Sequence, residues 1–126
     1  MADPPSTSHA LAGATVIANL SASNETVSKD AYRELLVKST SARLLCGYIY
    51  TSAGEGESTQ DLVFGGHNLI AENGTLLAQS SRFATGILYT DMDVLKISSE
   101  RRRMGTFGRQ PTVSYCKIPF SMELTE

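Results

Sequence analysis

The stretch ATVIANLSASNETVSK, residues 14–29, joins a short apolar run to a loop of hydroxyl and amide side chains. The run from Thr15 to Leu20 is typical of a buried strand, and a helix is expected to begin at Lys29. In α/β sheets, ligands bind outside the carboxyl ends of the strands, and a polar loop leading into a helix offers hydroxyls and free backbone N–H groups there. Ordinary turn and capping hydrogen bonds are the other use open to its polar side chains, Ser21, Ser23, Asn24 and Ser28.

A long helix is predicted directly after this stretch. It is expected to run from Lys29 to about Cys46, with Ser28 as its N-terminal cap and Gly47 as its stop. Small and apolar residues recur in it every three or four positions, which predicts a stripe that faces a sheet. The residues of this stripe are Ala31, Leu35, Leu36, Ser39, Ala42, Leu45 and Cys46.

Two short helices are predicted nearer the ends of the chain. Paired prolines favour a first helix that is capped by Ser6 and ends near Gly13. Asp93 can cap the second helix, which ends at the three arginines 101–103, where cations suit the negative end of the helix dipole. An anion or partner contact is the alternative role for these arginines.

Strands of two kinds follow the long helix. The run at 48–51 completes a strand–helix–strand unit, so it is predicted to pair in parallel with the strand at 15–20. Asn73-Gly74 between apolar runs is a strong hairpin signal, because both residues tolerate a positive φ. Residues 52–60 form an acidic loop without the lysine of a P-loop, so they are no phosphate cradle. The shorter strands are expected at 62–64, 68–71, 76–78 and 86–93.

The composition is that of an ordinary globular domain. The 126 residues are 41% hydrophobic and 19% charged, and the net charge of −2 gives no global electrostatic case for nucleic acid or an anionic membrane. No run approaches the roughly 18 apolar residues of a membrane span, and the N-terminus lacks a signal-peptide pattern. We therefore expect a cytoplasmic protein with no nucleic-acid and no membrane partner.

No catalytic constellation stands out. There is no Gly-x-Ser-x-Gly elbow and no HExxH motif, and Cys46 and Cys116 show no metal spacing, so no metal site is predicted. Cys46 is interpreted as a small buried residue of the long helix. His9 is interpreted as a solvated or capping residue and His67 as a polar strand residue. A small hydrolase that uses either histidine with Glu57 stays open as a weaker alternative.

A series of ordered segments carries a family resemblance. The segments are PPS (4–6), ALAGA (10–14), NLSAS (19–23), SAR (41–43), GEGEST (54–59), DLVF (61–64), LIAENG (69–74), SRF (81–83) and ERRRMGTF (100–107). In this order, over about residues 4–108, they resemble the glutaminase domain of glutamine-dependent NAD⁺ synthetases. That domain belongs to the nitrilase, or carbon–nitrogen hydrolase, superfamily. So many motifs in one order make the resemblance specific.

The resemblance implies an α/β fold, a partial nitrilase-like α-β-β-α sandwich with a β-hairpin and a C-terminal tail. In the family, a Cys, Glu and Lys triad hydrolyses glutamine through a thioester, and a separate synthetase domain uses ATP and Mg²⁺ to amidate deamido-NAD⁺ with the ammonia. The family nucleophile lies in a Cys-Glu-Asp segment before the Pro-Pro-Ser motif, where this chain has only Met1-Ala2-Asp3. The chain is therefore expected to lack the catalytic Cys, Glu and Lys, to need no cofactor in this domain, and to be inactive alone.

Two substrate-binding positions carry over from the family. Ser23 matches a residue that helps to hold the amino-acid end of glutamine, and Lys29 matches a basic position that meets its α-carboxylate. A hydroxyl and a cation beside a helix N-terminus suit a carboxylate. Lysine offers a point charge where some relatives have the planar fork of arginine. The resemblance thus implies a substrate site at Ser23 and Lys29, with no catalytic and no metal-binding residue.

The resemblance also implies two regions and a set of partners. Residues 1–104 are expected to form the partial glutaminase domain, and residues 105–126, where no periodicity persists, a linker toward a synthetase domain. The expected partners are glutamine, a missing N-terminal half and that synthetase domain. An exposed apolar face predicts homo-oligomers. The alternative function is a non-catalytic binding or assembly piece that a separate N-terminal half completes.

Overall fold

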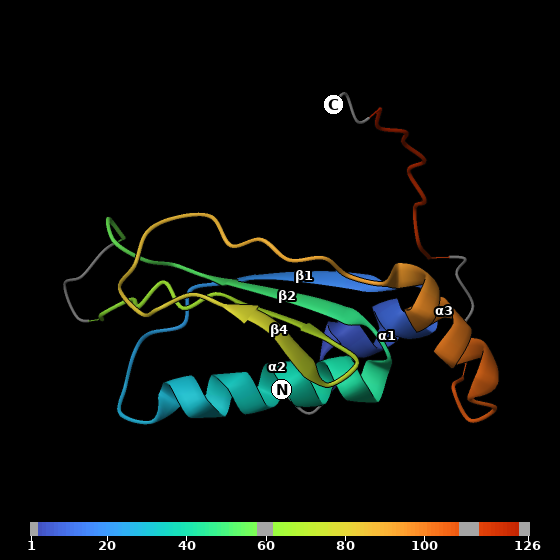
Figure 1. The fold of residues 1–126 in the computed structure, drawn as a ribbon, viewed down its shortest axis with the longest axis horizontal. Helices are drawn as coiled ribbons and strands as arrows, with labels where there is room; N and C mark the ends of the chain where they lie inside the picture. The colour runs from blue at the N-terminus through green and yellow to red at the C-terminus, as the bar shows by residue number, and fades with distance from the viewer. Residues whose placement is uncertain (1–2, 58–61, 109–113, 124–126) are drawn as a thin grey trace.

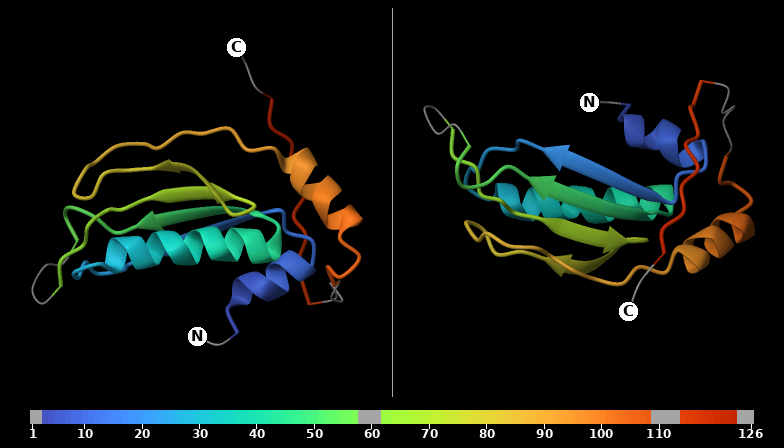
Figure 2. Two further views of the ribbon diagram at one scale, coloured as in Figure 1. Left: turned by 60° about the horizontal axis from the view of Figure 1, so that its bottom comes forward. Right: turned by 90° about the horizontal axis from the view of Figure 1, so that it is seen from above.

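A four-stranded sheet with one long helix along its face forms the centre of the fold (Figure 1). The computed structural model describes residues 3–57, 62–108 and 114–123. The strands are β1 Val16–Ser21, β2 Gly47–Ser52, β3 Leu69–Glu72 and β4 Thr75–Gln79, in the spatial order β1-β2-β3-β4. Helix α2, Lys29–Leu44, covers one face of the sheet, and the short helices α1, Pro5–Leu11, and α3, Val94–Arg103, lie near one end of it (Figure 2).

The predicted strand–helix–strand unit is confirmed. β1 and β2 pair in parallel along their whole length and end together at Ser21 and Ser52, so both carboxyl ends meet at one edge of the sheet. β3 pairs antiparallel with β2 and with β4. The turn from β3 to β4 uses Asn73 and Gly74 with φ of 43° and 84°, the left-handed conformations that a tight hairpin requires. The predicted hairpin is therefore confirmed as well.

The face that α2 buries is not the predicted one. Its buried residues are Arg33, Val37, Ser41 and Leu44. The predicted stripe is exposed within the helix, with Leu35 at 63% and Leu36 at 47%. Hydrogen bonding explains part of the difference, because Ser41 Oγ accepts a hydrogen bond of 2.9 Å from the Gly74 N–H in the hairpin turn. Only the end of the stripe beyond the helix, Leu45 and Cys46, is buried as predicted.

The three predicted caps had different outcomes. Asp93 caps α3 as predicted, since its carboxylate accepts a hydrogen bond of 2.8 Å from the Lys96 N–H. Ser6 is not a cap, because the helix already begins one residue earlier and buries Ser6 inside its first turn. Ser28 does precede α2, but its φ is 64° and its side chain makes no capping hydrogen bond.

The strand predicted at 62–64 is wrong. Phe64 makes only an isolated bridge, to Asn24 of the serine loop. The neighbouring carbonyl of Val63 accepts a hydrogen bond of 2.7 Å from the Glu25 N–H. The Gly65-Gly66 break prevents a longer ladder, and the segment instead ties two loops together.

The strand predicted at 86–93 is also wrong, since these residues form no strand. They run toward α3 with apolar side chains such as Ile87 and Tyr89 exposed. Met92 at the end of the segment packs directly on Gly47, where an added Cβ would lie 1.9 Å from the Met92 sulfur. Met92 therefore packs on the sheet, while most of this apolar run stays exposed and pairs with no strand.

Parts of two predictions lie outside the described residues. These parts are residues 58–60 of the acidic loop and residues 109–113 and 124–126 of the predicted tail. The described tail segments, 105–108 and 114–123, contain no helix and no strand. The division of the chain at residue 104 stays a prediction. In the described ranges, no helix is both long and apolar enough to span a membrane.

The core lies between α2 and the sheet. It contains side chains from every layer: Ala10, Ile17, Val37, Leu44, Cys46, Tyr48, Tyr50, Leu69 and Ala71. On β1, alternate residues point to opposite faces, so Ile17 is buried while Val16 and Leu20 are exposed. The sheet face away from α2 therefore stays open at β1, which is also an edge strand among the described residues.

Candidate functional site

Three loops meet at the carboxyl ends of β1 and β2. The Ala53 N–H donates to the Ser21 carbonyl at 2.8 Å, which joins the ends of the two strands. The Gly66 N–H donates to the Ala53 carbonyl at 2.9 Å, and so brings in the loop before β3. The serine loop is held to that same loop through the Glu25 N–H. The predicted edge for a ligand site is therefore built from three mutually bonded loops.

A cavity of about 300 Å³ opens beside this edge, between α2 and the sheet. This volume is at the lower limit of typical small-molecule pockets. Its polar end is lined by Asn19, Ser23, Lys29 and Arg33. Its apolar and aromatic side is formed by Pro4, Leu36, Val37, Tyr48 and Tyr50. Both predicted substrate-binding residues, Ser23 and Lys29, thus lie in one cavity.

Lys29 is the first residue of α2 and its ammonium donates a hydrogen bond to Asn24 Oδ1. Asp30 follows it, and the pKa of that carboxyl is lowered, mainly by a hydrogen bond from the Ala31 backbone N–H. The charge of Arg82, 3.7 Å away, acts in the same direction. The start of α2 therefore presents one ammonium and one ionised carboxylate side by side.

Arg33 is the buried cation of the site, with 4% of its surface exposed. Its NH1 lies 2.8 Å from Glu25 Oε1, and the Glu25 side chain is also buried. The guanidinium carbon lies 5.9 Å from the centre of the Tyr50 ring. Gly65 makes room for the pair, because a Cβ there would lie 2.5 Å from Glu25 Cγ. The apolar periodicity of the helix does not indicate Arg33, because arginine is treated as a surface residue when the buried stripe is assigned.

His67 is buried, at 5% exposure, and not the polar strand residue that the sequence predicted. It precedes β3, and its Nδ1 lies 3.0 Å from Arg33 NH1. An arginine can only donate, so Nδ1 accepts and the ring proton sits on Nε2. Nε2 lies 3.3 Å from Gln79 Oε1 and donates to it, so both ring nitrogens have a partner and the tautomer with the proton on Nε2 is fixed.

Neither histidine reaches Glu57, which is exposed in the acidic loop. His9 instead meets the Tyr115 ring edge-on, with ring centroids 5.6 Å apart. Cys46 is fully buried, and this burial raises the pKa of its thiol to about 11, as the prediction of a buried, unreactive residue requires. Cys116 is exposed. In the part of the chain that is described, no three His, Cys, Asp or Glu side chains gather where they could hold a metal ion.

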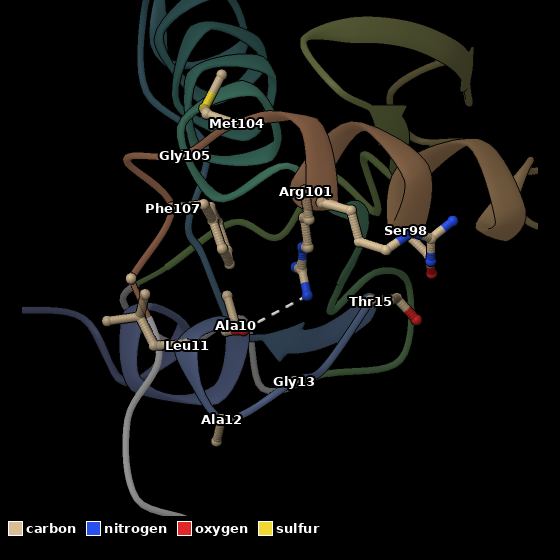
Figure 3. Close-up of a pocket in the computed structure, with 12 residues that line it drawn as sticks. Ala10, Leu11, Ala12, Gly13, Thr15, Ser98, Arg101, Met104, Gly105 and Phe107 are labelled. Atoms are coloured by element: carbon tan, nitrogen blue, oxygen red, sulfur yellow. Dashed lines mark hydrogen bonds between the residues drawn. The ribbon is translucent and has the colours of Figure 1, made fainter.

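A second cavity, of about 740 Å³, lies at the other end of the sheet between α1, α3 and the segment after α3 (Figure 3). Arg101 reaches across it and stacks 4.8 Å from the centre of the Phe107 ring. Its guanidinium donates to the carbonyls of Ala10, Ala14, Leu44 and Leu45. Burial lowers the pKa of Arg101. The anion contact considered for the three arginines does not apply to Arg101, which the chain's own carbonyls occupy.

The fold is that of part of a carbon–nitrogen hydrolase. The chain is similar to the crystal structure of a carbon–nitrogen hydrolase from Helicobacter pylori G27, with a TM-score of 0.60 and 18% identity over 75% of this chain and 37% of that chain. One helix layer on one sheet is half of an α-β-β-α sandwich, so the predicted α/β class and partial fold are confirmed. No family model matches the chain.

The sequence is similar to a segment of glutamine-dependent NAD⁺ synthetases. The enzyme of that name from Mycobacterium tuberculosis (strain ATCC 25618 / H37Rv) is 48% identical, over 95% of this chain and 19% of its own length. The crystal structure of another from Cytophaga hutchinsonii has a TM-score of 0.56 and 35% identity, over 59% of this chain and 13% of that chain. The family resemblance carried by the motifs is therefore confirmed. The chain spans about a fifth of the length of the curated relatives it matches.

Proposed function

We propose that these residues form part of the glutaminase of a glutamine-dependent NAD⁺ synthetase and supply one wall of its glutamine pocket. The observation that carries the proposal is the cavity at the strand ends, where Ser23 and Lys29 lie together. Similarity to synthetases over 95% of the chain supports it. In such an enzyme, glutamine is hydrolysed to glutamate and ammonia, and the ammonia amidates deamido-NAD⁺.

The chemistry of the polar end suits an amino acid. The Ser23 hydroxyl and the Lys29 ammonium both donate hydrogen bonds, and a carboxylate oxygen accepts them. Lys29 is also the first residue of α2, where the positive end of the helix dipole favours an anion. We assign the α-carboxylate of glutamine to this end of the cavity.

The nucleophile is proposed to come from outside these residues. Cys46 is buried in the core with its thiol pKa raised to about 11, so it supplies no thiolate near neutral pH. Cys116 does not match the family's Cys-Glu-Asp segment. ATP and Mg²⁺ are likewise assigned to a synthetase domain outside these residues. The relatives are named glutamine-dependent NAD⁺ synthetases, which supports a synthetase activity in the whole enzyme.

Glutamine binding and turnover test this proposal together. The purified 126-residue chain is expected to bind L-glutamine weakly in calorimetry and to release no ammonia from it. Lys29→Met should weaken binding by about tenfold, the value of one charge-assisted hydrogen bond, while Lys38→Met, on the outer face of the same helix, should not change it. Ammonia release above the buffer rate would refute the assignment of the nucleophile, and equal effects of the two variants would refute the site.

A second candidate function, a non-catalytic assembly piece, is favoured by the apolar surface. Tyr32, Leu35 and Leu36 on α2 and Leu20 on β1 are all exposed, at 47–83%. Tyr32, Leu35 and Leu36 are neighbours on one face of α2, and a contiguous exposed apolar patch often marks a protein interface. We propose that the chain alone self-associates, and that an N-terminal half of a relative's glutaminase displaces the second copy. Sedimentation that shows a monomer at all concentrations, together with no co-purification of that half, would exclude this candidate.

A further inference from the structure

Arg33 makes more side-chain contacts than any other residue at the polar end of the cavity. One nitrogen, NH1, lies 2.8 Å from Glu25 and donates to His67 at 3.0 Å, and the other, NH2, donates to Ser23 Oγ at 3.4 Å. These partners come from the serine loop and from the loop before β3. A planar guanidinium with several fixed donors can hold three groups at set directions, which an ammonium cannot do.

The direction of these bonds fixes what Ser23 offers. Because arginine has no acceptor, Ser23 Oγ must accept from Arg33, and one of its lone pairs is thereby used. The hydroxyl hydrogen is then left to donate. A donor at Ser23 suits a carboxylate or carbonyl oxygen of a ligand and does not suit an ammonium group.

The charges around Arg33 are arranged so that a different cation serves the ligand. Glu25, buried beside it, compensates the guanidinium charge, whereas Lys29 in the same cavity bonds only to the neutral amide of Asn24 in the described residues. Arg33 Nε is buried and has no hydrogen-bond partner among the described residues. The Glu25 carboxylate oxygens beside it likewise lack a hydrogen bond of good geometry, so an ordered water between the two side chains can serve both.

We propose that Arg33 is a positioning residue, which acts with Glu25 and His67 to hold the serine loop and to turn the Ser23 hydroxyl toward a ligand carboxylate at Lys29. The identity of that ligand as glutamine rests on the proposed function above. The positioning of the serine loop does not rest on the proposed function, because it is argued only from contacts within the chain. Neither Arg33 nor its two buried partners follows from the family positions at Ser23 and Lys29.

A ligand-free experiment tests the positioning itself. Arg33→Lys keeps the charge and removes the fork, and Lys38→Met on the same helix is the control. The variant should accelerate amide hydrogen exchange at Glu25 by at least about tenfold, and the ¹⁵N signals of the His67 ring should lose the single-tautomer pattern, because Nδ1 loses its donor. Exchange at the β2 amides should not change. Wild-type exchange at Glu25 with an unaltered His67 ring would overturn the proposal.

A double-mutant cycle tests the effect on the ligand. If Arg33 acts through Ser23, Arg33→Lys should weaken L-glutamine binding by about tenfold in the native chain but by less than about twofold in a Ser23→Ala background. An equal loss in both backgrounds would mean a general structural role and would overturn the proposal.

The two experiments also separate this inference from the proposed function. Should the native chain bind no L-glutamine, the proposed pocket fails, and the exchange and His67 measurements still decide whether Arg33 positions the loop. If Arg33→Lys does not fold, Glu25→Gln replaces it, because that variant keeps the shape of the pair and removes its charge. The Glu25→Gln chain should show the same faster exchange at residue 25, and unchanged exchange there would overturn the proposal.

Discussion

Two arginines at opposite ends of the sheet are held by different kinds of partner. Arg33, near the carboxyl ends of β1 and β2, contacts the side chains of Glu25, His67 and Ser23. Arg101, at the other end, donates to four backbone carbonyls and stacks on Phe107 (Figure 3). The first arginine joins side chains of the two loops at the strand ends, and the second ties together the segment after α1, the end of α2 and α3.

The difference teaches that cavity size alone does not decide where a ligand site is to be proposed. The cavity at Arg101 is larger, about 740 Å³ against about 300 Å³, but its central cation is already occupied by the chain's own carbonyls. At the smaller cavity, Lys29 and the hydroxyl hydrogen of Ser23 are directed to no carboxylate among the described residues. Ligand chemistry is therefore expected at the Arg33 end and structural support at the Arg101 end.

The largest effect is expected when the Arg33 end is broken. Arg33→Met leaves Glu25 buried without its counter-charge, and removing one partner of a buried pair costs about 3–5 kcal/mol of unfolding free energy. Lys38→Met, which removes only an exposed pair with Glu34, should cost less than about 0.5 kcal/mol. Urea unfolding of the two variants measures both values, and similar small losses would show that the buried pair is not needed.

A smaller loss is expected at the Arg101 end. Arg101→Met should cost about 2–3 kcal/mol, the value of one or two hydrogen bonds from a charged donor, because α3 can move away and let water reach the remaining carbonyls. Arg102→Met is the matched control. The Arg102 side chain is exposed, so its replacement should leave the stability nearly unchanged. Thermal unfolding of both variants checks this. Equal stabilities would contradict the role given to Arg101.

The core beside Arg101 predicts a dependence on pH. The Cys46 thiol has its pKa raised by burial from 9.0 to about 11. Its contribution to stability is complete below pH 9 and is lost as the pH rises through 11, with a total of at most about 2.7 kcal/mol. Cys46→Ala should flatten this part of the profile relative to the native chain. At pH 8, a soluble alkylating reagent should modify Cys116 and leave Cys46 unreacted, and rapid reaction of both thiols would contradict the burial.

The smallest effect concerns the turn before Arg33. Ser28 has a φ of 64° and no capping hydrogen bond, so its side chain gains nothing there and its backbone is strained. Ser28→Gly should stabilise the fold by about 0.5 kcal/mol, whereas Ser39→Gly in the exposed middle of α2 should destabilise it by about 0.5–1 kcal/mol. A loss in both variants would mean that Ser28 acts as an ordinary cap after all.

Local signals in the sequence predict only part of the local structure, since the caps at Ser6 and Ser28 and the strands at 62–64 and 86–93 are not formed. The parallel unit, the Asn73-Gly74 hairpin and the Asp93 cap depend on neighbouring residues, and all three are confirmed. The face of α2 depends on partners far along the chain, such as His67 at Arg33 and Gly74 at Ser41, and its prediction is wrong. Periodicity sorts residues by polarity alone, so a buried arginine with distant partners gives no signal.

The same limit applies to the candidate site. Ser23 and Lys29 could be singled out because they stand in one stretch of sequence, and the structure places them in one cavity. His67 and Gln79 join the network only through the fold, 34 and 46 residues beyond Arg33. Their place in the network follows only from the three-dimensional path of the loops that meet at the strand ends.

A titration of the isotopically labelled 126-residue chain with L-glutamine tests the central claim most directly. Our account predicts saturable chemical-shift changes at residues 21–25 and over the first turn of α2, and no change around Arg101 and Phe107. Changes centred on the cavity at Arg101, or no saturable change up to the solubility of glutamine, would contradict it.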